Sequence, residues 1–197
     1  MEDKIREYEE WLVAGMPMPA PDYARTLAVL TLAREHGISV FVETGTLIGS
    51  RVGAVLHDFR EIHSVELSKE LYSRCVGRFR GMSHVHLYNG DSGQILPDIL
   101  SSVQERCLYF LDAHYSAGTT ARGNRDSALE DEMSVIVPRL EKYDDVILVD
   151  DTYDLCGTNG YLTEESIASM IHTVKPGYRI EVKDYILRAY PGQPTCH

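Results

Sequence analysis

The sequence predicts an α/β fold with a doubly wound, mostly parallel sheet that ends in an antiparallel hairpin. Three observations support this prediction. A short apolar run, residues 40–42, leads through an acid into two glycines four residues apart, Gly45 and Gly49. Five apolar runs of strand length alternate with helical patterns, which is typical of parallel strands joined by crossover helices. The chain then closes on two alternating runs, 178–182 and 185–190, with no helix between them.

The chain has 197 residues and carries 30 acidic against 19 basic side chains, a formal charge of −11. This length suits one domain over residues 1–197, in which helices over 1–37 cover an α/β core over 38–190. The acidic balance argues against nucleic acid or an anionic membrane as a partner. No apolar run reaches the roughly 20 residues that span a bilayer, and the charged N-terminus does not read as a signal peptide. The four scattered cysteines indicate reduced thiols, so we expect a cytoplasmic protein and leave a homodimer open.

Two helices are expected before the first strand. Residues 2–14 place apolar side chains on one helical stripe, and the proline-rich run 16–21 then interrupts the chain. Asp22 is expected to cap a second helix that ends at Gly37, a residue suited to the left-handed position after a helix. The sequence leaves open whether these helices only pack on the sheet or cover a ligand crevice.

The stretch from Val40 to Ser50 predicts a site for a nucleotide-type ligand. Glycine is needed at such a turn because the backbone must take a positive φ or let a ligand press against it. A helix expected over 51–59 would aim its free N–H groups at the bound molecule. The residues of this stretch that we expect at the ligand are Glu43, Thr44, Gly45, Thr46, Gly49 and Ser50.

The second predicted strand, residues 62–66, adds an acid at the same edge. Glu66 lies 21 residues after Gly45, the spacing at which an acid binds the ribose hydroxyls in nucleotide-binding βαβ units. Ser68 is expected to cap the helix that follows.

The third predicted strand, residues 84–88, runs into Asp91 and Ser92. We expect Ser92 to cap the next helix. Asp91 is expected to accept a hydrogen bond from an adenine amine, with helix capping as the alternative.

The fourth and fifth predicted strands also end in acids. Residues 106–112 end at Asp112, and residues 145–151 end at Asp150 and Asp151. Because the carboxyl ends of neighbouring parallel strands meet at one edge, the three carboxylates are expected to converge. Such acids repel one another unless a cation lies among them, and oxygen ligands suit Mg²⁺, Mn²⁺ or Ca²⁺. The alternative is that one acid caps a helix and another holds a loop backbone.

His114 is the candidate general base. It lies two residues after Asp112 in a long polar loop, and an imidazole titrates near neutral pH. The sequence leaves open a structural role for His114, and Tyr115 is an alternative base.

Two more helices and the hairpin complete the chain. Asp126 is expected to cap an amphipathic helix. Another helix is expected over 163–174, with two acids in its first turn but without the S/T-x-x-E/Q form of a capping box. Lys183 and Asp184 are expected to form the hairpin turn.

The order and spacing of these residues resemble those of class I S-adenosylmethionine-dependent methyltransferases, which have a Rossmann-like sheet. In that family an acid and glycines end the first strand, as Glu43-x-Gly45-x-x-x-Gly49 does here, and Leu47 replaces the middle glycine as in small catechol-type O-methyltransferases. The resemblance implies S-adenosylmethionine as the cofactor, with Glu66 on its ribose. It also implies that Asp91, Ser92 and Asp112 line the cofactor site.

The three aspartates are similar to the divalent-metal site of catechol-type and macrocin-type O-methyltransferases. The resemblance implies that Asp112, Asp150 and Asp151 hold Mg²⁺ or Mn²⁺, and that Asp112 and His114 act in catalysis. The catechol pattern has a lysine three residues after the first aspartate, whereas this sequence has Tyr115 there.

Together these features predict a metal-assisted O-methyltransferase that acts on a small hydroxyl-bearing acceptor, such as a vicinal diol or a sugar. An NAD-dependent oxidoreductase is the competing enzyme class. Against it stand the incomplete G-x-G-x-x-G, the terminal hairpin and the paired acids Asp150 and Asp151. A non-catalytic S-adenosylmethionine-binding protein of the same fold is the third hypothesis.

Overall fold

The computed structural model of the chain describes residues 2–112, 127–158 and 161–192. Its strands are β1 (Val40–Thr44), β2 (Glu61–Glu66), β3 (Val85–Asn89), β4 (Cys107–Leu111), β5 (Val146–Val149), β6 (Tyr178–Lys183) and β7 (Ile186–Pro191). They form one sheet in the order β3-β2-β1-β4-β5-β7-β6. The first five strands are parallel, and β7 runs antiparallel to both β5 and β6. The predicted doubly wound sheet with a terminal hairpin is confirmed.

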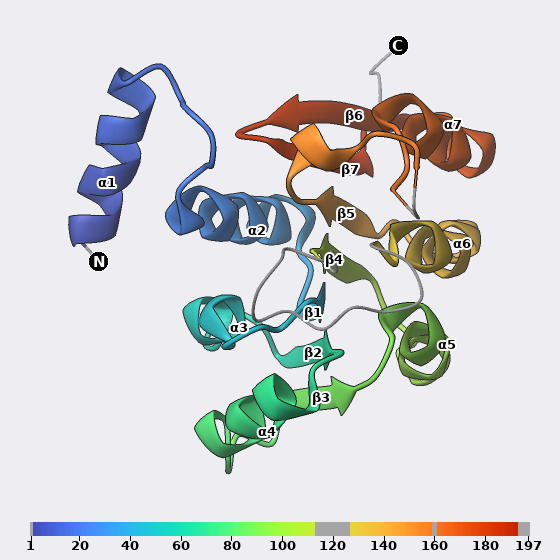
Figure 1. The fold of residues 1–197 in the computed structure, drawn as a ribbon. Coiled ribbons are helices and arrows are strands. Elements are labelled where there is room, and N and C mark those ends of the chain that lie inside the picture. Colours follow the sequence, from blue (N-terminus) through green and yellow to red (C-terminus); the bar gives the residue numbers. More distant parts are fainter. Residues whose placement is uncertain (1, 113–126, 159–160, 193–197) are drawn as a thin grey trace.

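Helices cover both faces of the sheet (Figure 1). One face carries α2 (Asp22–His36), α3 (Ser50–Val55) and α4 (Lys69–Arg78), and the other carries α5 (Ser92–Ser102), α6 (Leu129–Arg139) and α7 (Glu164–Val174). Each layer has its own apolar core. Neighbouring residues of β4 serve different layers, with Leu108 in the first and Tyr109 in the second. Burial on both faces explains why the central strands are continuous apolar runs in the sequence.

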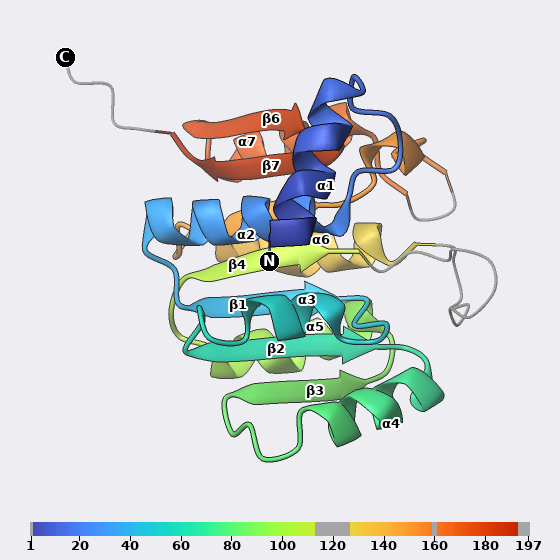
Figure 2. The same ribbon diagram turned by 90° about the vertical axis from the view of Figure 1, so that its left-hand side faces the viewer.

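The strand order reverses between β1 and β4, which lie side by side at the centre of the sheet. Figure 2 shows β1, β2 and β4 from the side, all running in the same direction. In open α/β sheets, ligands bind outside the carboxyl ends of the strands at such a reversal. The residues that follow β1, β2 and β4 are therefore the ones that the fold places at a ligand site.

Helix starts differ from the prediction at two positions. α2 begins after Pro21, whose extended backbone (φ −66°, ψ 149°) takes the capping position, and the side chain of Asp22 makes no capping hydrogen bond. Asp91, and not Ser92, caps α5, because its carboxylate accepts the N–H of Gly93 at 3.0 Å. In both cases the helix starts one residue away from the expected position.

Other helix ends show two confirmations and two differences from the prediction. Gly37 (φ 62°) and Ser68 take the predicted capping positions of α2 and α4. A capping box is present at α7, because Thr163 and Ser166 exchange side-chain hydrogen bonds and serine replaces the usual Glu or Gln. α3 ends at Val55, four residues earlier than expected, and a turn follows it. The predicted cap Asp126 lies outside the described residues.

The hairpin turn is shifted by one residue from the prediction. β6 ends by pairing Lys183 with Ile186, so Asp184 and Tyr185 form the turn. Both have positive φ, 56° and 61°, as a two-residue type I′ turn requires. Tyrosine is unusual there, and its hydroxyl is held by the carbonyl of Met16 at 2.8 Å.

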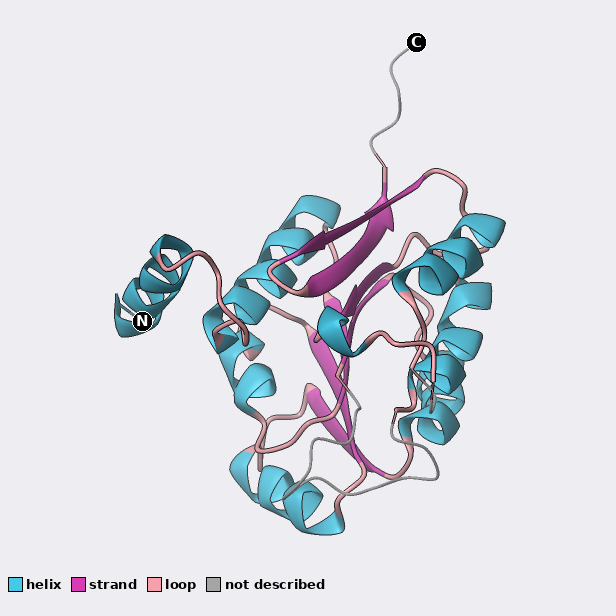
Figure 3. Cartoon of the chain, turned by 45° about the horizontal axis from the view of Figure 1, so that its top comes forward, coloured by secondary structure: helices cyan, strands magenta, loops and turns pink. Residues whose placement is uncertain are grey.

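α1 (Glu2–Val13) lies apart from the sheet, on the outer side of α2 (Figure 3). Trp11 is buried against Ala20 and Ala24, with Tyr8 and Tyr185 beside it. The contacts of α1 are therefore with the start of α2 and with the hairpin. In the described part of the chain, no helix has the length and apolarity needed to cross a membrane.

A chain that lacks residues 1–14 is expected to stay folded and to lose about 3 kcal/mol of unfolding free energy, because the packing of α1 depends mainly on Trp11. S-adenosylhomocysteine affinity should stay within about twofold, since α1 supplies no strand end. If these helices cover the crevice, acceptor affinity should fall. Circular dichroism and calorimetry measure these effects, and Trp11→Ala is the matched control for the packing loss. An unfolded truncated chain would show that α1 belongs to the core.

Candidate functional site

Three residues with positive φ shape the turn after β1. They are Gly45 (83°), Leu47 (52°) and Gly49 (74°). The N–H of Leu47 donates to the carboxylate of Glu66 at 2.7 Å, which holds the leucine in this conformation. A Cβ at Gly49 would lie 2.6 Å from the ring of Phe79, so the packing of the turn on α4 also requires glycine there. The backbone requirement that the sequence predicts for both glycines is present.

Glu66 anchors this turn from the carboxyl end of β2. Its carboxylate accepts the N–H of Leu47 with one oxygen and the N–H of Ser68 with the other, both at 2.7 Å. Each carboxylate oxygen has a second acceptor site, so Glu66 can still bind two ligand hydroxyls. Leu47 and Leu67 are 43% and 38% exposed on either side of this hydrogen-bonded group. They offer apolar surface next to the acid.

Most of the other residues predicted in this unit lie beneath the turn. Glu43, Thr44 and Thr46 are buried, whereas Ser50 at the start of α3 is exposed. The hydroxyl of Ser64 donates to Glu43 at 2.6 Å and shares a 2.6 Å hydrogen bond with Thr46. Burial raises the pKa of Glu43 to about 7. These three buried residues therefore shape the turn from below.

The side chain of Ser92 contacts an acid that the sequence analysis did not identify. Its hydroxyl donates to the carboxylate of Glu132, on α6, at 2.5 Å. Glu132 is only 1% exposed, and burial raises its pKa to about 7. The signal was present in the sequence, because position 132 lies three residues after Leu129 and four before Ile136, on the apolar stripe of the helix. Asp91 stays partly exposed.

The structure brings the three predicted aspartates together. One carboxylate oxygen from each of Asp112, Asp150 and Asp151 lies within 4.8 Å of the other two. β4 and β5 pair up to Leu111 and Val149, so the residues that follow are neighbours. Asp150 is 6% exposed, and burial together with the nearby Asp112 raises its pKa to about 7. Within the described chain, no group donates a hydrogen bond to its Oδ1.

An arginine from α2 pairs with two of these acids. The Nε of Arg25 donates to Asp150 Oδ2 at 2.5 Å, and its Nη2 donates to Asp151 Oδ1 at 2.7 Å. Its Nη1 donates to the carbonyl of Ala20 at 2.6 Å. Part of the positive charge expected among the acids is therefore supplied by the chain itself. No local pattern identified Arg25, because its partners lie more than a hundred residues away in the sequence.

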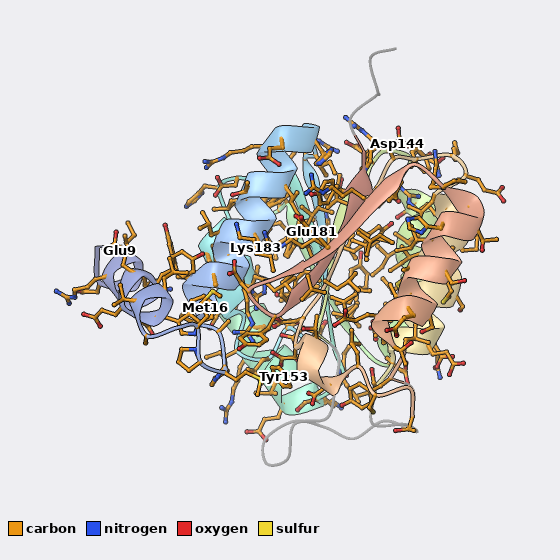
Figure 4. All side chains as sticks on the ribbon, turned by 90° about the horizontal axis from the view of Figure 1, so that it is seen from above. Glu9, Met16, Asp144, Tyr153, Glu181 and Lys183 are labelled. Carbon is orange, nitrogen blue, oxygen red and sulfur yellow. The ribbon has the colours of Figure 1, made fainter. Side chains whose placement is uncertain are left out.

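The acid at the other end of β5 provides a contrast. Asp144 comes before β5 in the chain and Tyr153 comes after it, and Figure 4 labels both residues. Asp145, just before β5, accepts hydrogen bonds from a backbone N–H, a tyrosine hydroxyl and the Nε of Arg139, at 2.8 to 3.2 Å. Both of its oxygens are used inside the protein, as expected of a structural acid. Asp150 differs because only one of its oxygens is used in this way.

A cleft of about 300 Å³, including space open to solvent, lies over the carboxyl ends of β4 and β5. No basic side chain occurs among the described residues that line it. Its acidic lining residues are Asp112, Glu132, Asp150, Asp151 and Asp154. The cleft therefore favours a metal ion or another positively charged group.

The predicted base His114 and its alternative Tyr115 lie outside the described residues. Their roles stay predictions. Cys75, Cys107 and Cys156 are free thiols in the structure, and Cys196 lies outside the described residues.

No protein-family model matches the sequence, and no curated protein matches it. Solved structures do. An O-methyltransferase from Bacillus cereus in complex with SAH has 12% identity and a TM-score of 0.59, over 95% of this chain and 90% of that one. The O-methyltransferase TomG from Streptomyces achromogenes, in complex with SAM, has 14% identity and a TM-score of 0.58, over 98% of this chain and 90% of that one. The N-methyltransferase NodS from Bradyrhizobium japonicum has 15% identity and a TM-score of 0.53, over 87% of this chain and 97% of that one.

These likenesses show that the chain has the class I methyltransferase fold, as the sequence resemblance implies. They include enzymes that methylate oxygen and an enzyme that methylates nitrogen. The fold by itself therefore does not fix the acceptor atom.

Proposed function

We propose that this protein is an S-adenosylmethionine-dependent O-methyltransferase that uses a divalent metal ion and acts on a small hydroxyl-bearing acceptor. The observation that carries the proposal is the meeting of two features at one edge of a methyltransferase-type sheet. A turn anchored by Glu66 follows β1, and three converging carboxylates follow β4 and β5. An NAD-dependent oxidoreductase has less support, because the sheet closes with an antiparallel hairpin and resembles methyltransferases.

The turn and its neighbours fit S-adenosylmethionine. Glu66 would accept hydrogen bonds from the ribose hydroxyls, and Leu47 and Leu67 would contact the apolar faces of the adenosine. Asp91, partly exposed at the start of α5, would bind the adenine amine, and Asp112 would lie beside the amino-acid part. When bound, the cofactor supplies an electrophilic methyl group.

The three aspartates fit a divalent ion in donor type, spacing and charge. The three carboxylate oxygens lie within 4.8 Å of one another, so small side-chain shifts would bring them to the separations of about 3 to 4 Å between the ligands of an octahedral Mg²⁺. Arg25 binds Asp150 through Oδ2 and leaves Oδ1 for a metal. One guanidinium and one divalent ion also balance the three carboxylates. When bound, the metal would lower the pKa of the acceptor hydroxyl and orient its oxygen.

The acceptor hydroxyl must lose its proton as its oxygen gains the methyl group. We propose His114 as the base, from its place two residues after Asp112 in the sequence. Glu132 lines the cleft, and its pKa of about 7 lets it hold or release a proton near neutral pH. The burial of Glu132 suits it to a supporting role.

A labelled-methyl assay tests the activity. Transfer from S-adenosylmethionine is measured with a panel of catechols, vicinal diols and sugars, each with Mg²⁺ and with a chelator. Calorimetry with S-adenosylhomocysteine and with NAD separates the two enzyme classes. Binding of NAD but not of S-adenosylhomocysteine would overturn the proposal. Binding of S-adenosylhomocysteine without transfer to any acceptor would favour the non-catalytic hypothesis.

Glu66→Gln is expected to lower S-adenosylhomocysteine affinity at least tenfold, because weakening hydrogen bonds to a charged acceptor costs roughly 1.5–3 kcal/mol. Calorimetry measures the loss. The amide oxygen can accept only one of the two backbone N–H groups that the carboxylate holds, so the free energy of unfolding should fall by about 1–3 kcal/mol, the cost of one unpaired N–H. Glu66→Ala should also destabilise the turn, since it leaves the N–H of Leu47 without its acceptor.

The matched control for this variant is Glu70→Gln, which removes an exposed acid of α4 that pairs with Arg74. It should leave S-adenosylhomocysteine affinity unchanged. If Glu66→Gln also binds the ligand with unchanged affinity while it stays folded, Glu66 does not belong to the cofactor site.

A further inference from the structure

Arg51 is a buried arginine beside the proposed cofactor site. It is the second residue of α3 and is 8% exposed, and its guanidinium lies 3.8 Å from the centre of the Phe110 ring. Carboxylates from three elements surround it. Its Nε lies 3.5 Å from Glu43, and its Nη2 lies 3.8 Å from Asp22 and 4.0 Å from Asp112. These distances exceed the usual 2.7–3.2 Å of a hydrogen bond.

The guanidinium has donor capacity that the described protein does not use. No residue in the described ranges accepts a hydrogen bond from its buried Nη1. Arg139, which is similarly buried, differs in this respect, because it donates to Asp145 and to the backbone carbonyls of Leu100 and Val103. Buried guanidiniums normally find such acceptors. Among the described residues, Arg51 is therefore held by ring packing and surrounding charge and not by close hydrogen bonds.

The surroundings of Arg51 indicate the chemistry of a matching ligand. A guanidinium fork binds a carboxylate through two parallel hydrogen bonds. The flanking acids Glu43 and Asp112 would attract a positive group at the same place. The side chains of Asp22 and Asp112 are 47% and 25% exposed, so solvent reaches the acids on this flank of Arg51, whereas the arginine itself is buried. A group that carries both a carboxylate and an ammonium, as an α-amino acid does, satisfies both requirements.

We propose that Arg51 binds the carboxylate of the amino-acid part of S-adenosylmethionine, with the ammonium group lying toward the flanking acids. This inference rests on the proposed function, because it assigns one end of the same cofactor. It makes Arg51 the residue that selects a cofactor with an intact amino-acid end over other adenosine compounds.

The test uses calorimetry with three ligands that differ only at this end. They are S-adenosylhomocysteine, its decarboxylated analogue, which keeps the amine, and 5′-methylthioadenosine, which has neither group. The variants are Arg51→Met, which keeps the stem over Phe110, and Arg51→Lys, which keeps the charge but not the fork. Arg34→Met is the matched control, because Arg34 is an exposed arginine of α2 that pairs with Asp58.

The unmutated protein should bind S-adenosylhomocysteine at least tenfold more tightly than the decarboxylated analogue. Arg51→Met should lower the affinity for S-adenosylhomocysteine at least tenfold. Its affinities for the other two ligands should stay within about twofold, so that the preference disappears. Arg51→Lys should retain part of the preference, and Arg34→Met all of it.

An equal loss for all three ligands in Arg51→Met and Arg51→Lys would show that Arg51 is structural and overturn the inference. A preference that survives in either variant at its full size would overturn it as well. Should Arg51→Met not fold, Arg51→Lys with the same ligands decides. If the unmutated protein binds none of the three ligands, the proposed function fails, and that result differs from every outcome that tests Arg51 alone.

Discussion

Asp150→Asn is expected to abolish divalent-ion binding together with methyl transfer, and to leave S-adenosylhomocysteine bound. Asp150 is the most buried acid of the proposed metal site, with Oδ2 held by Arg25 and Oδ1 without a hydrogen-bond donor among the described residues. Asparagine keeps the shape and can still accept from Arg25, but its neutral amide is a much poorer ligand for a hard cation. Because a bound metal supplies several kcal/mol of charge stabilisation, the rate should fall about a thousandfold or more. A chelator should have the same effect on the unmutated protein.

Rates with Mg²⁺ and with a chelator, together with metal and S-adenosylhomocysteine titrations, measure these effects. Asp154→Asn is the matched control, because Asp154 lines the same cleft outside the triad. It should keep metal binding. If titration finds no divalent ion bound to the unmutated protein, with or without S-adenosylhomocysteine, the three aspartates are structural acids whose counter-ion is Arg25.

Glu132→Gln is expected to stabilise the metal-free protein at pH 8 and to leave its stability unchanged near pH 4. Burial raises the pKa of Glu132 from about 4.5 to about 7. Between these values the folded chain holds a proton that the unfolded chain has released, so the raised pKa makes stability fall as pH increases through this window. The shift corresponds to up to about 3 kcal/mol at pH 8. Glutamine stays neutral and can still accept a hydrogen bond from Ser92. The variant therefore does not lose this stability as the pH rises.

Chemical unfolding between pH 4 and pH 8, in the presence of a chelator, measures the slope of unfolding free energy against pH. Part of the slope should remain in the variant, because burial also raises the pKa values of Glu43 and Asp150. The control is Glu130→Gln, an exposed acid of the same helix, which should keep the full slope. An identical slope in Glu132→Gln and the unmutated protein would show that Glu132 is ionised in the folded state at its ordinary pKa.

The strand ends were predictable because they depend on patterns within short stretches. Continuous apolar runs identify strands buried on both faces, and the parallel order then places every strand end at one edge. Glu66, Asp112 and Asp150 each follow such a run, so their common location could be predicted without any contact being known. Gly45 and Gly49 were predictable for a similar reason, because the turn after β1 needs positive φ wherever the rest of the chain lies.

The sequence by itself therefore determined the sheet, its terminal hairpin, the turn after β1 and the meeting of the three aspartates. Only the tertiary structure decided the partners of these groups. Arg25 reaches Asp150 across the sheet edge, and Tyr185 takes a positive φ in the hairpin turn while its hydroxyl is held by Met16. Local patterns report which backbone conformation and which burial a residue favours, but a contact between distant segments exists only after the sheet has brought them together. The ion pairs of Arg25 and the position of Arg51 among three acids follow from that packing.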